Sequence, residues 1–371
     1  MKILYLADGA ATHTRRWLNW FSSKGHDVEL ATFNKNILTG YNRVSCHVLW
    51  RSHSNSILER FIKAPIIYLK LLFIIFRFKP DVIHSHSAGA YAWITLFIPK
   101  IPIVITPWGV DLLEDVYNSY FNYFFTRASL KNADYVTTDG RHFIKLLNGL
   151  GVHKKKISVV YFGVDTHYFS PAKNKLKNKS STKLKIISTR TLYPVHDVLT
   201  LINAVSRVYR SNKNFEVLII GDGSEKPHLE NKCIREGLEK ICHFYGNVDH
   251  SVMLNLLRQS DIYVSTSPLD AGIAASTAEA MSVGLPIIHT NFGDNNFWTP
   301  NKIGGLLFTP GSDKELAKNI LELLKNKKLR DKLSKFSRDK IIKNYNIDIE
   351  MKKVEKIYSS LAVNLNSEFH P

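Results

Sequence analysis

One stretch of the chain combines small residues, an acidic residue and a helix stop in a chemically useful order. It runs from Asp270 through Gly272 and Ser276 to Glu279, and it ends at Gly284. Glycine lets backbone approach a ligand closely, and the first amides of a following helix form a favourable seat for a phosphate group. A carboxylate beside a phosphate makes sense where it accepts hydrogen bonds from a pair of hydroxyl groups, as in the ribose of a nucleotide. The alternative is that Glu279 is a solvated helix residue and Gly284 an ordinary helix cap.

The elements around this stretch alternate between short apolar runs and amphipathic segments. Helices are expected at 14–23 and 198–209. The expected strands are 3–7, 27–31, 46–50, 80–84, 101–106, 133–137, 157–161, 185–188, 216–220, 243–245, 262–264 and 287–289. Strands that alternate with helices predict an α/β fold with parallel sheets covered on both faces. Such sheets bind ligands at the carboxyl ends of their strands.

The chain has 371 residues, which is too many for one ordinary core, so two domains are expected. A polar, basic segment at 170–182 without apolar periodicity is the best candidate for a linker. The predicted division is an N-terminal domain at 1–170, a linker at 171–183, a C-terminal domain at 184–345, and a final helix and tail at 346–371.

The composition is that of a globular protein rather than a disordered one, with 44% hydrophobic and 22% charged residues. A formal net charge of +18 indicates an anionic partner, such as a phosphorylated small molecule, an acidic membrane face or nucleic acid. Cys46, Cys233 and Cys242 have no metal-ligand spacing, and their odd number does not suggest a disulfide framework. No hydrophobic leader precedes the first expected strand. These features together predict a cytoplasmic protein.

The segment 57–78 is rich in aliphatic and aromatic residues. Lys70 interrupts its apolar run at 66–76, and four further basic residues flank that run. A membrane-spanning helix needs roughly 20 mainly apolar residues, so this segment falls short. The pattern favours a helix that lies in a membrane interface with its basic side chains near anionic headgroups. A buried core helix is the alternative.

Several blocks of sequence together resemble one known family. The chain is similar, over nearly its full length, to bacterial and archaeal glycosyltransferases of family 4, also called group 1, which have the GT-B fold. The blocks occur in the family's order, at 24–28, 81–86, 162–165, Phe169, Pro171, Arg190, 219–223, 244–248 and 279–288. Each block is weak alone, but their order and spacing are specific.

The resemblance implies two Rossmann-like, doubly wound domains that face each other across a cleft. In this family the C-terminal domain binds a nucleotide-diphospho-sugar, here UDP- or GDP-linked, and the N-terminal domain binds a glycan or lipid-linked acceptor. The final helix, here 347–361, crosses back to the first domain. The resemblance further implies retaining transfer, with no cofactor beyond the donor substrate and no metal.

The family's acid-x7-acid motif assigns Glu279 to the donor ribose. Its first acidic position falls on Ala271, one residue after Asp270, so Asp270 is a catalytic candidate that faces the sugar only if the loop shifts. A residue that caps a turn is the alternative for Asp270. The small residues Gly272 and Ser276 belong to the same donor loop and helix start.

Arg190 matches the family's basic residue that faces the diphosphate, and a guanidinium fork suits phosphate oxygens. Where relatives commonly carry Lys-Gly, this chain has His196-Asp197, so a phosphate contact from His196 would depend on its protonation. Gly246 and Asn247 match the turn that holds the nucleobase through backbone groups. The alternative for His196 is a surface histidine in a loop. The alternative for Gly246 is a tight turn that requires glycine.

In the N-terminal domain, Gly9 and Ala10 lie in the first strand-to-helix loop, which would close over the diphosphate or the acceptor with backbone amides. His13 and His86 are catalytic candidates near the same edge. Trp108 stands where many relatives carry a histidine near the reacting sugar, and an indole can stack on a sugar but cannot exchange a proton.

The predicted function is a retaining glycosyltransferase of surface polysaccharide or glycolipid synthesis, cytoplasmic and peripheral at the inner membrane face. A catalytically silent GT-B scaffold and a sugar-nucleotide epimerase or hydrolase are the alternatives. A nucleic-acid binder is disfavoured, because no basic motif with interleaved aromatic residues occurs.

Overall fold

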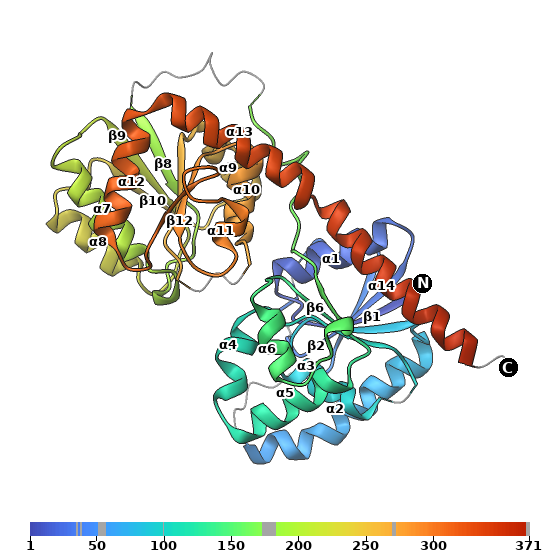
Figure 1. Cartoon of the computed structure of the whole chain (residues 1–371). Helices are drawn as coiled ribbons and strands as arrows, with labels where there is room; N and C mark the ends of the chain where they lie inside the picture. Colours follow the sequence, from blue (N-terminus) through green and yellow to red (C-terminus); the bar gives the residue numbers. More distant parts are fainter. Residues whose placement is uncertain are drawn as a thin grey trace. The chain divides into compact units, whose positions relative to one another are not determined.

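The computed structural model describes residues 1–34, 36–37, 39–50, 57–98, 100–172, 183–268 and 272–368. The chain divides into two compact units. The first unit comprises Met1–Val160 together with Glu350–Pro371, and the second comprises Tyr161–Ile349. Each unit is built around one parallel β-sheet, so each can be described from its own strand order (Figure 1).

The first unit contains a seven-stranded sheet with the order β3-β2-β1-β4-β5-β6-β7. Its strands are β1 (Lys2–Leu6), β2 (Asp27–Thr32), β3 (Val44–Val48), β4 (Val82–Ser85), β5 (Ile103–Ile105), β6 (Tyr135–Thr138) and β7 (Ile157–Val159). Its helical segments are α1 (Thr12–Ser23), α2 (Ile57–Phe78), α3 (Ala90–Trp93), η1 (Ile94–Phe97), α4 (Val110–Leu113), η2 (Asp115–Tyr117), α5 (Tyr120–Asn132), α6 (Phe143–Gly149) and η3 (Lys154–Lys156).

Every strand pair in this sheet is parallel. The central strands β1 and β4 are buried along almost their whole length. β1 forms a continuous apolar run in the sequence, whereas β4 also buries His84 and Ser85. Because β1 pairs with both β2 and β4, the chain reverses its direction of winding between β1 and β4. That reversal is the point at which doubly wound sheets bind their ligands.

The C-terminal helix α14 (Ile347–Glu368) joins this sheet through a buried polar chain. The Tyr358 hydroxyl is bonded to the Tyr5 hydroxyl at 2.9 Å and to Nδ1 of His84, and all three residues are fully buried. Nε2 of His84 is in turn bonded to Thr106 Oγ1 at 2.6 Å. Buried polar groups need such partners, so this series of hydrogen bonds fixes where the helix docks.

The second unit contains a six-stranded sheet with the order β10-β9-β8-β11-β12-β13. Its strands are β8 (Leu184–Ser188), β9 (Phe215–Ile220), β10 (Cys242–Gly246), β11 (Ile262–Ser265), β12 (Ile287–Thr290) and β13 (Leu306–Phe308). Its helical segments are η4 (Pro194–His196), α7 (Val198–Tyr209), α8 (Lys226–Arg235), α9 (His250–Gln259), α10 (Ala275–Val283), α11 (Asn295–Trp298), α12 (Asp313–Lys325) and α13 (Lys327–Asn344).

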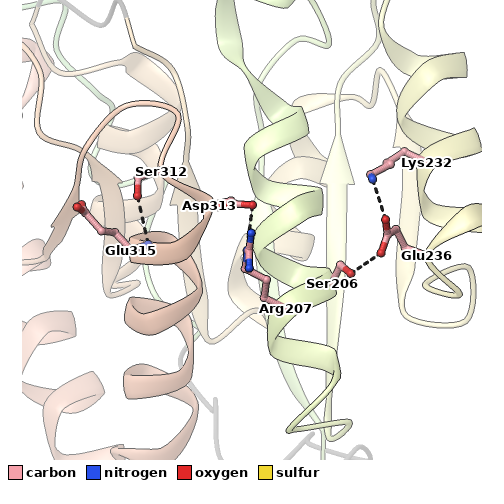
Figure 2. A network of polar contacts seen from close by, with 7 residues as sticks. All are labelled: Ser206, Arg207, Lys232, Glu236, Ser312, Asp313 and Glu315. Carbon is pink, nitrogen blue, oxygen red and sulfur yellow. Dashed lines mark hydrogen bonds and ion pairs between the residues drawn. The ribbon is translucent and has the colours of Figure 1, made fainter.

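Polar contacts join three of these helices at the surface (Figure 2). Arg207 of α7 donates to Asp313 of α12 at 3.0 Å, and Ser206 of α7 donates to Glu236 at 2.7 Å. Lys232 of α8 pairs with the same Glu236. Exposed pairs of this kind contribute little stability each, so the apolar core between helices and sheet carries the packing.

The predicted α/β class with two doubly wound sheets is confirmed. The strand β13 was not predicted. The structure assigns Tyr161–Ser170 to the second unit, ten residues before the predicted domain boundary. Most of the predicted linker, 173–182, lies outside the described residues.

Candidate active site

The candidate site of the second unit lies at the carboxyl ends of β8 and β11. These neighbouring strands are the point at which the winding of this sheet reverses, because β8 also pairs with β9 while β11 pairs with β12. Loops that leave such a point diverge to opposite faces of the sheet and leave a crevice between them. Arg190 follows β8 by two residues, and the segment before α10 follows β11.

Arg190 joins the two loops. Its Nη1 donates to Ser276 Oγ at 3.2 Å, and its Nη2 donates to His196 Nδ1 at 2.9 Å. Ser276 is the second residue of α10, so the guanidinium lies against the first turn of that helix. A cation and a helix N-terminus at one point create strong positive potential, which favours an anionic ligand.

The bond from Arg190 determines which tautomer His196 adopts. Because Nδ1 accepts a hydrogen bond from a guanidinium, the ring proton of the neutral imidazole is on Nε2. Burial and then the charge of Arg190 lower the pKa of His196 to about 4. His196 is therefore neutral near pH 7 and still offers an N–H donor.

The backbone around His196 is also fixed. Thr266, just after β11, donates from Oγ1 to the His196 carbonyl at 2.9 Å. Asp197 adopts a left-handed backbone conformation with φ of 46°, and its side chain accepts from Thr200 to begin α7. Asp is one of the few side chains that tolerate this conformation.

Tyr263 was missed by the sequence analysis. Its side chain is fully buried in β11, and its hydroxyl lies 3.5 Å from Thr189 Oγ1. Burial raises its pKa, and nearby Arg190, Ser276 and Thr189 oppose that effect. The phenol thus supports the residues that hold the guanidinium, and no sequence signal separates it from the other apolar strand residues.

Helix α10 carries the acidic residue of the predicted motif. Glu279 is the fifth residue of the helix, and only 8% of it is exposed, so it is not the solvated helix residue of the alternative interpretation. The helix ends at Gly284, which has φ of 82°. Gly272 is buried just before the helix, whereas Asp270 and Ala271 lie outside the described residues.

The predicted nucleobase turn packs against the loop that carries Arg190. Gly221 N donates to the Gly246 carbonyl at 2.8 Å, and Asn247 is exposed directly after it. A Cβ atom on Gly221 would lie 2.3 Å from the Arg190 carbonyl oxygen, so only glycine fits there. The block 219–223 therefore brings the turn and the arginine loop together.

The loop after β1 differs from its prediction. Gly9 N donates to Thr32 Oγ1 at 3.1 Å, Ala10 N to Asp8 Oδ1 at 2.9 Å, and Ala11 N to the Asp8 carbonyl at 3.1 Å. These amides already have acceptors within the protein. The expectation that Gly9 and Ala10 present open amides to a diphosphate or acceptor is corrected accordingly.

His86 lies inside an aromatic cluster. Its ring centroid is 4.8 Å from Trp17 and 5.4 Å from Trp108, and only 3% of the residue is exposed. Burial lowers its pKa well below the usual value, and in the described part of the chain neither ring nitrogen has a hydrogen-bond partner. A base needs access to its proton. The geometry favours a packing role over the predicted catalytic one.

His13 and Trp108 form the outer part of the same cluster. Their ring centroids are 4.5 Å apart, and both residues are half-buried. Burial lowers the pKa of His13 to about 4, so its ring is neutral at pH 7. Asp111, which the sequence analysis did not select, accepts from Trp108 N at 2.9 Å and from Ala88 N at 2.8 Å, and so joins two loops of this edge.

Within the described ranges, no group of three or more histidine, cysteine, aspartate or glutamate side chains is placed to hold a metal ion. The arrangement in the second unit suits a ligand with a charged phosphate group and hydroxyl groups, since cation, helix amides and a buried carboxylate lie along one strand edge. The edge of the first unit offers aromatic surfaces and neutral rings, which suit a sugar or another flat, polar molecule.

Two family models match the chain, one on each half. The family model for Glycosyltransferase Family 4 matches residues 7–168, and the model for Glycosyl transferases group 1 matches residues 170–340. Together they span both units almost completely.

Individual relatives are more distant. An Escherichia coli UDP-Gal:alpha-D-GlcNAc-diphosphoundecaprenol alpha-1,3-galactosyltransferase is 27% identical over 309 residues, which cover 77% of each chain. An uncharacterized glycosyltransferase of Methanocaldococcus jannaschii is 25% identical over 257 residues, 67% of this chain and 65% of the relative. The crystal structure of Anabaena HepE with UDP superposes with a TM-score of 0.82 at 18% identity, covering 97% of this chain and 100% of that one. This chain is therefore a glycosyltransferase of family 4, group 1, with the GT-B fold.

Proposed function

We propose that this chain is a retaining glycosyltransferase that moves a sugar from a UDP- or GDP-linked donor to a glycan or lipid-linked acceptor. The second unit would bind the donor and the first unit the acceptor, in synthesis of a surface polysaccharide or glycolipid. The observation that carries the proposal is the Arg190 guanidinium, which spans Ser276 and His196 at the start of α10.

The donor diphosphate would lie against Arg190, the amides at the start of α10 and the Nε2–H of His196. Glu279 would accept hydrogen bonds from the ribose hydroxyls. A neutral His196 suits this site, because it donates a hydrogen bond while Arg190 supplies the positive charge. These groups are held in place before the reaction, which is the condition under which electrostatic stabilisation is most effective.

In the proposed reaction, the acceptor hydroxyl oxygen bonds to the anomeric carbon while the bond from that carbon to the diphosphate breaks. The electron pair leaves with the diphosphate, and the proton of the acceptor moves to a phosphate oxygen. Arg190 stabilises the charge that develops on the leaving group. No histidine base is required, which agrees with the burial of His86.

The named relatives support a uridine donor and a lipid-linked acceptor. The E. coli relative is named for UDP-Gal and for an acceptor on diphosphoundecaprenol, and HepE has been crystallised with UDP-glucose as well as with UDP. We therefore expect UDP to bind more tightly than GDP.

The test is calorimetric titration of the full chain with UDP, GDP and NAD. We expect Arg190→Gln to weaken UDP binding about tenfold or more, since it removes a charge-assisted fork. Arg207→Gln is the matched control, because Arg207 pairs with Asp313 far along α7 from the site. Equal UDP affinity of wild type and Arg190→Gln would overturn the assignment of the donor site.

A second measurement separates an active enzyme from a silent scaffold. Incubation with UDP-sugars and membrane lipid extract should release UDP and yield a product with the anomeric configuration of the donor. A protein that binds UDP but turns over no nucleotide sugar would be a silent scaffold, and an inverted product would exclude retaining transfer.

A further inference from the structure

A polar cavity lies in the second unit at the carboxyl ends of β12 and β13. Asn291 follows β12 directly, and Thr309 follows β13 directly. Together with Asn296, Asn301 and Glu315, these residues line a cavity of about 350 Å³, which we call the asparagine pocket. Pockets that bind small molecules range from about 300 to 1,000 Å³, so this one has room for a small polar ligand.

The asparagine side chains of this pocket are held in place by backbone groups. The Asn296 Oδ1 atom accepts from Asn301 N at 3.2 Å, and the Asn301 Oδ1 atom accepts from Leu307 N at 3.1 Å. Because the oxygen of each amide is already bonded to the backbone, its NH₂ group is the part that remains for a ligand. Asn291 is positioned through its own backbone, whose N donates to the Phe308 carbonyl at 2.7 Å.

The carboxylate of the pocket is also fixed. Glu315 is the third residue of α12, and it accepts from Thr309 N at 2.7 Å and from Thr309 Oγ1 at 3.3 Å. Its own N donates to the Ser312 side chain, which begins the helix (Figure 2). A carboxylate has about four acceptor positions, so some remain for the hydroxyl groups of a ligand. The pocket therefore offers donors and acceptors side by side.

The lining of the pocket disfavours ions of either sign. Among the described residues that line it none is basic, and Glu315 is negatively charged, so a phosphate or another anion is disfavoured. A hard cation needs several oxygen ligands, whereas the amide oxygens of Asn296 and Asn301 are bonded to N–H groups. A neutral molecule rich in hydroxyl groups fits both properties, since each hydroxyl donates and accepts.

The asparagine pocket lies on the same sheet edge as the proposed donor site. β12 separates β13 from β11, the strand that leads into α10. Neighbouring strands lie about 4.8 Å apart, so the end of β13 is about 10 Å from the end of β11. A short oligosaccharide spans such a distance.

We propose that the asparagine pocket binds a neutral sugar residue of a glycan, other than the sugar of the donor. The NH₂ groups of Asn291, Asn296 and Asn301 donate to the sugar oxygens, and Glu315 accepts from its hydroxyl groups. That this sugar belongs to the glycan substrate of the enzyme rests on the proposed function. Binding of a sugar to the pocket does not depend on the donor site.

The test is saturation-transfer difference NMR of the full chain with methyl α-D-galactoside, methyl α-D-glucoside and lactose at millimolar concentrations. We expect transfer to at least one of these sugars. Asn291→Ala removes an amide donor and should weaken this binding about fivefold. Asn291→Asp keeps the size of the side chain but lacks the NH₂ group, so it should weaken binding as well. The matched control is Asn231→Ala, at an exposed asparagine of α8.

Absence of transfer to all three sugars would overturn the proposal, and so would sugar binding by Asn291→Ala at the wild-type affinity. Circular dichroism melting of the variants shows that they are folded. Arg190→Gln should leave sugar binding unchanged, so failure of the donor site appears in the UDP titration and not in these spectra. Calorimetric titration with calcium chloride covers the other occupant. Calcium binding that is lost in Glu315→Gln would assign the pocket to a cation instead.

Discussion

Arg190 contributes more than a positive charge, because its fork holds two other groups of the site. One arm donates to Ser276 and the other to His196, and the second bond keeps the proton of His196 on the outward nitrogen. A lysine has one ammonium group and no planar fork, so it cannot fix both partners in the same geometry. The position therefore depends on arginine rather than on charge alone.

This argument predicts that Arg190→Lys retains the charge but loses about tenfold in UDP affinity. Calorimetric titration measures the affinity, and Arg207→Lys controls for a general effect of the exchange. If Arg190→Lys binds UDP as the wild type does, charge alone suffices and the fork has no role in binding.

At this scale, the sequence predicted some residues and not others. Arg190, His196 and Ser276 could be predicted to lie together, because each follows a buried strand at the same edge of a parallel sheet. Tyr263 could not, since a buried strand residue that supports a site looks like one that fills the core. The packing of His86 could not be predicted either, because a strand end does not reveal whether a side chain points to solvent or into an aromatic cluster.

Close packing between elements positions the Arg190 loop. Gly221 has φ of 137°, and its α-carbon faces the Arg190 carbonyl so closely that no side chain fits. Gly311 also has a positive φ, 77°, but nothing lies within 4 Å of the place its Cβ would take. A side chain at Gly311 would therefore cause backbone strain alone, whereas a side chain at Gly221 would also displace the Arg190 loop.

We expect Gly311→Ala to cost about 1 kcal/mol of stability and to leave UDP binding unchanged. Gly221→Ala should cost about 3 kcal/mol or more and also weaken UDP binding, because the arginine loop must shift. Denaturant unfolding and calorimetry on both variants provide the measurements. Normal UDP affinity in Gly221→Ala would show that this contact does not position Arg190.

The Tyr358 hydroxyl group anchors helix α14 on the first unit. Tyr358→Phe removes the bonds to Tyr5 and His84 and leaves both buried groups without that partner, so we expect a loss of about 1 to 3 kcal/mol. Hydrogen exchange should become faster in α14 ahead of the rest of the first unit. The half-buried Tyr209→Phe is the control, and equal stability of both variants would count against an anchoring role for this chain of bonds.

For the whole molecule, the alternation of apolar runs was sufficient to predict two parallel sheets but not where one unit ends. Thr166 and Phe169 precede the polar segment in sequence, yet their carbonyl groups accept hydrogen bonds from Arg338 at 3.0 Å. Val164 pairs with Asn346 in the same unit. Contacts between residues so far apart in the chain cannot be deduced from local periodicity, whereas a strand can.

Both units bury histidines that are neutral in the folded state. Burial lowers the pKa of His84 in the first unit and of His289 in the second to about 3. Nε2 of His289 is bonded to Thr299 Oγ1, so the ring has a defined place in the core. In the unfolded chain a histidine has a pKa of about 6.5. Below pH 6.5 the unfolded chain therefore binds protons that the folded chain does not, and stability falls as pH decreases towards 3.

Each such histidine should lower the free energy of unfolding by about 2 kcal/mol between pH 7 and pH 5. Denaturant unfolding of the wild type at both pH values measures the total loss. In His289→Gln the loss should be smaller by that amount, because the glutamine does not titrate, whereas the exposed His228→Gln is the matched control. If His289→Gln loses as much stability on acidification as the wild type, protonation of this core position does not drive acid unfolding.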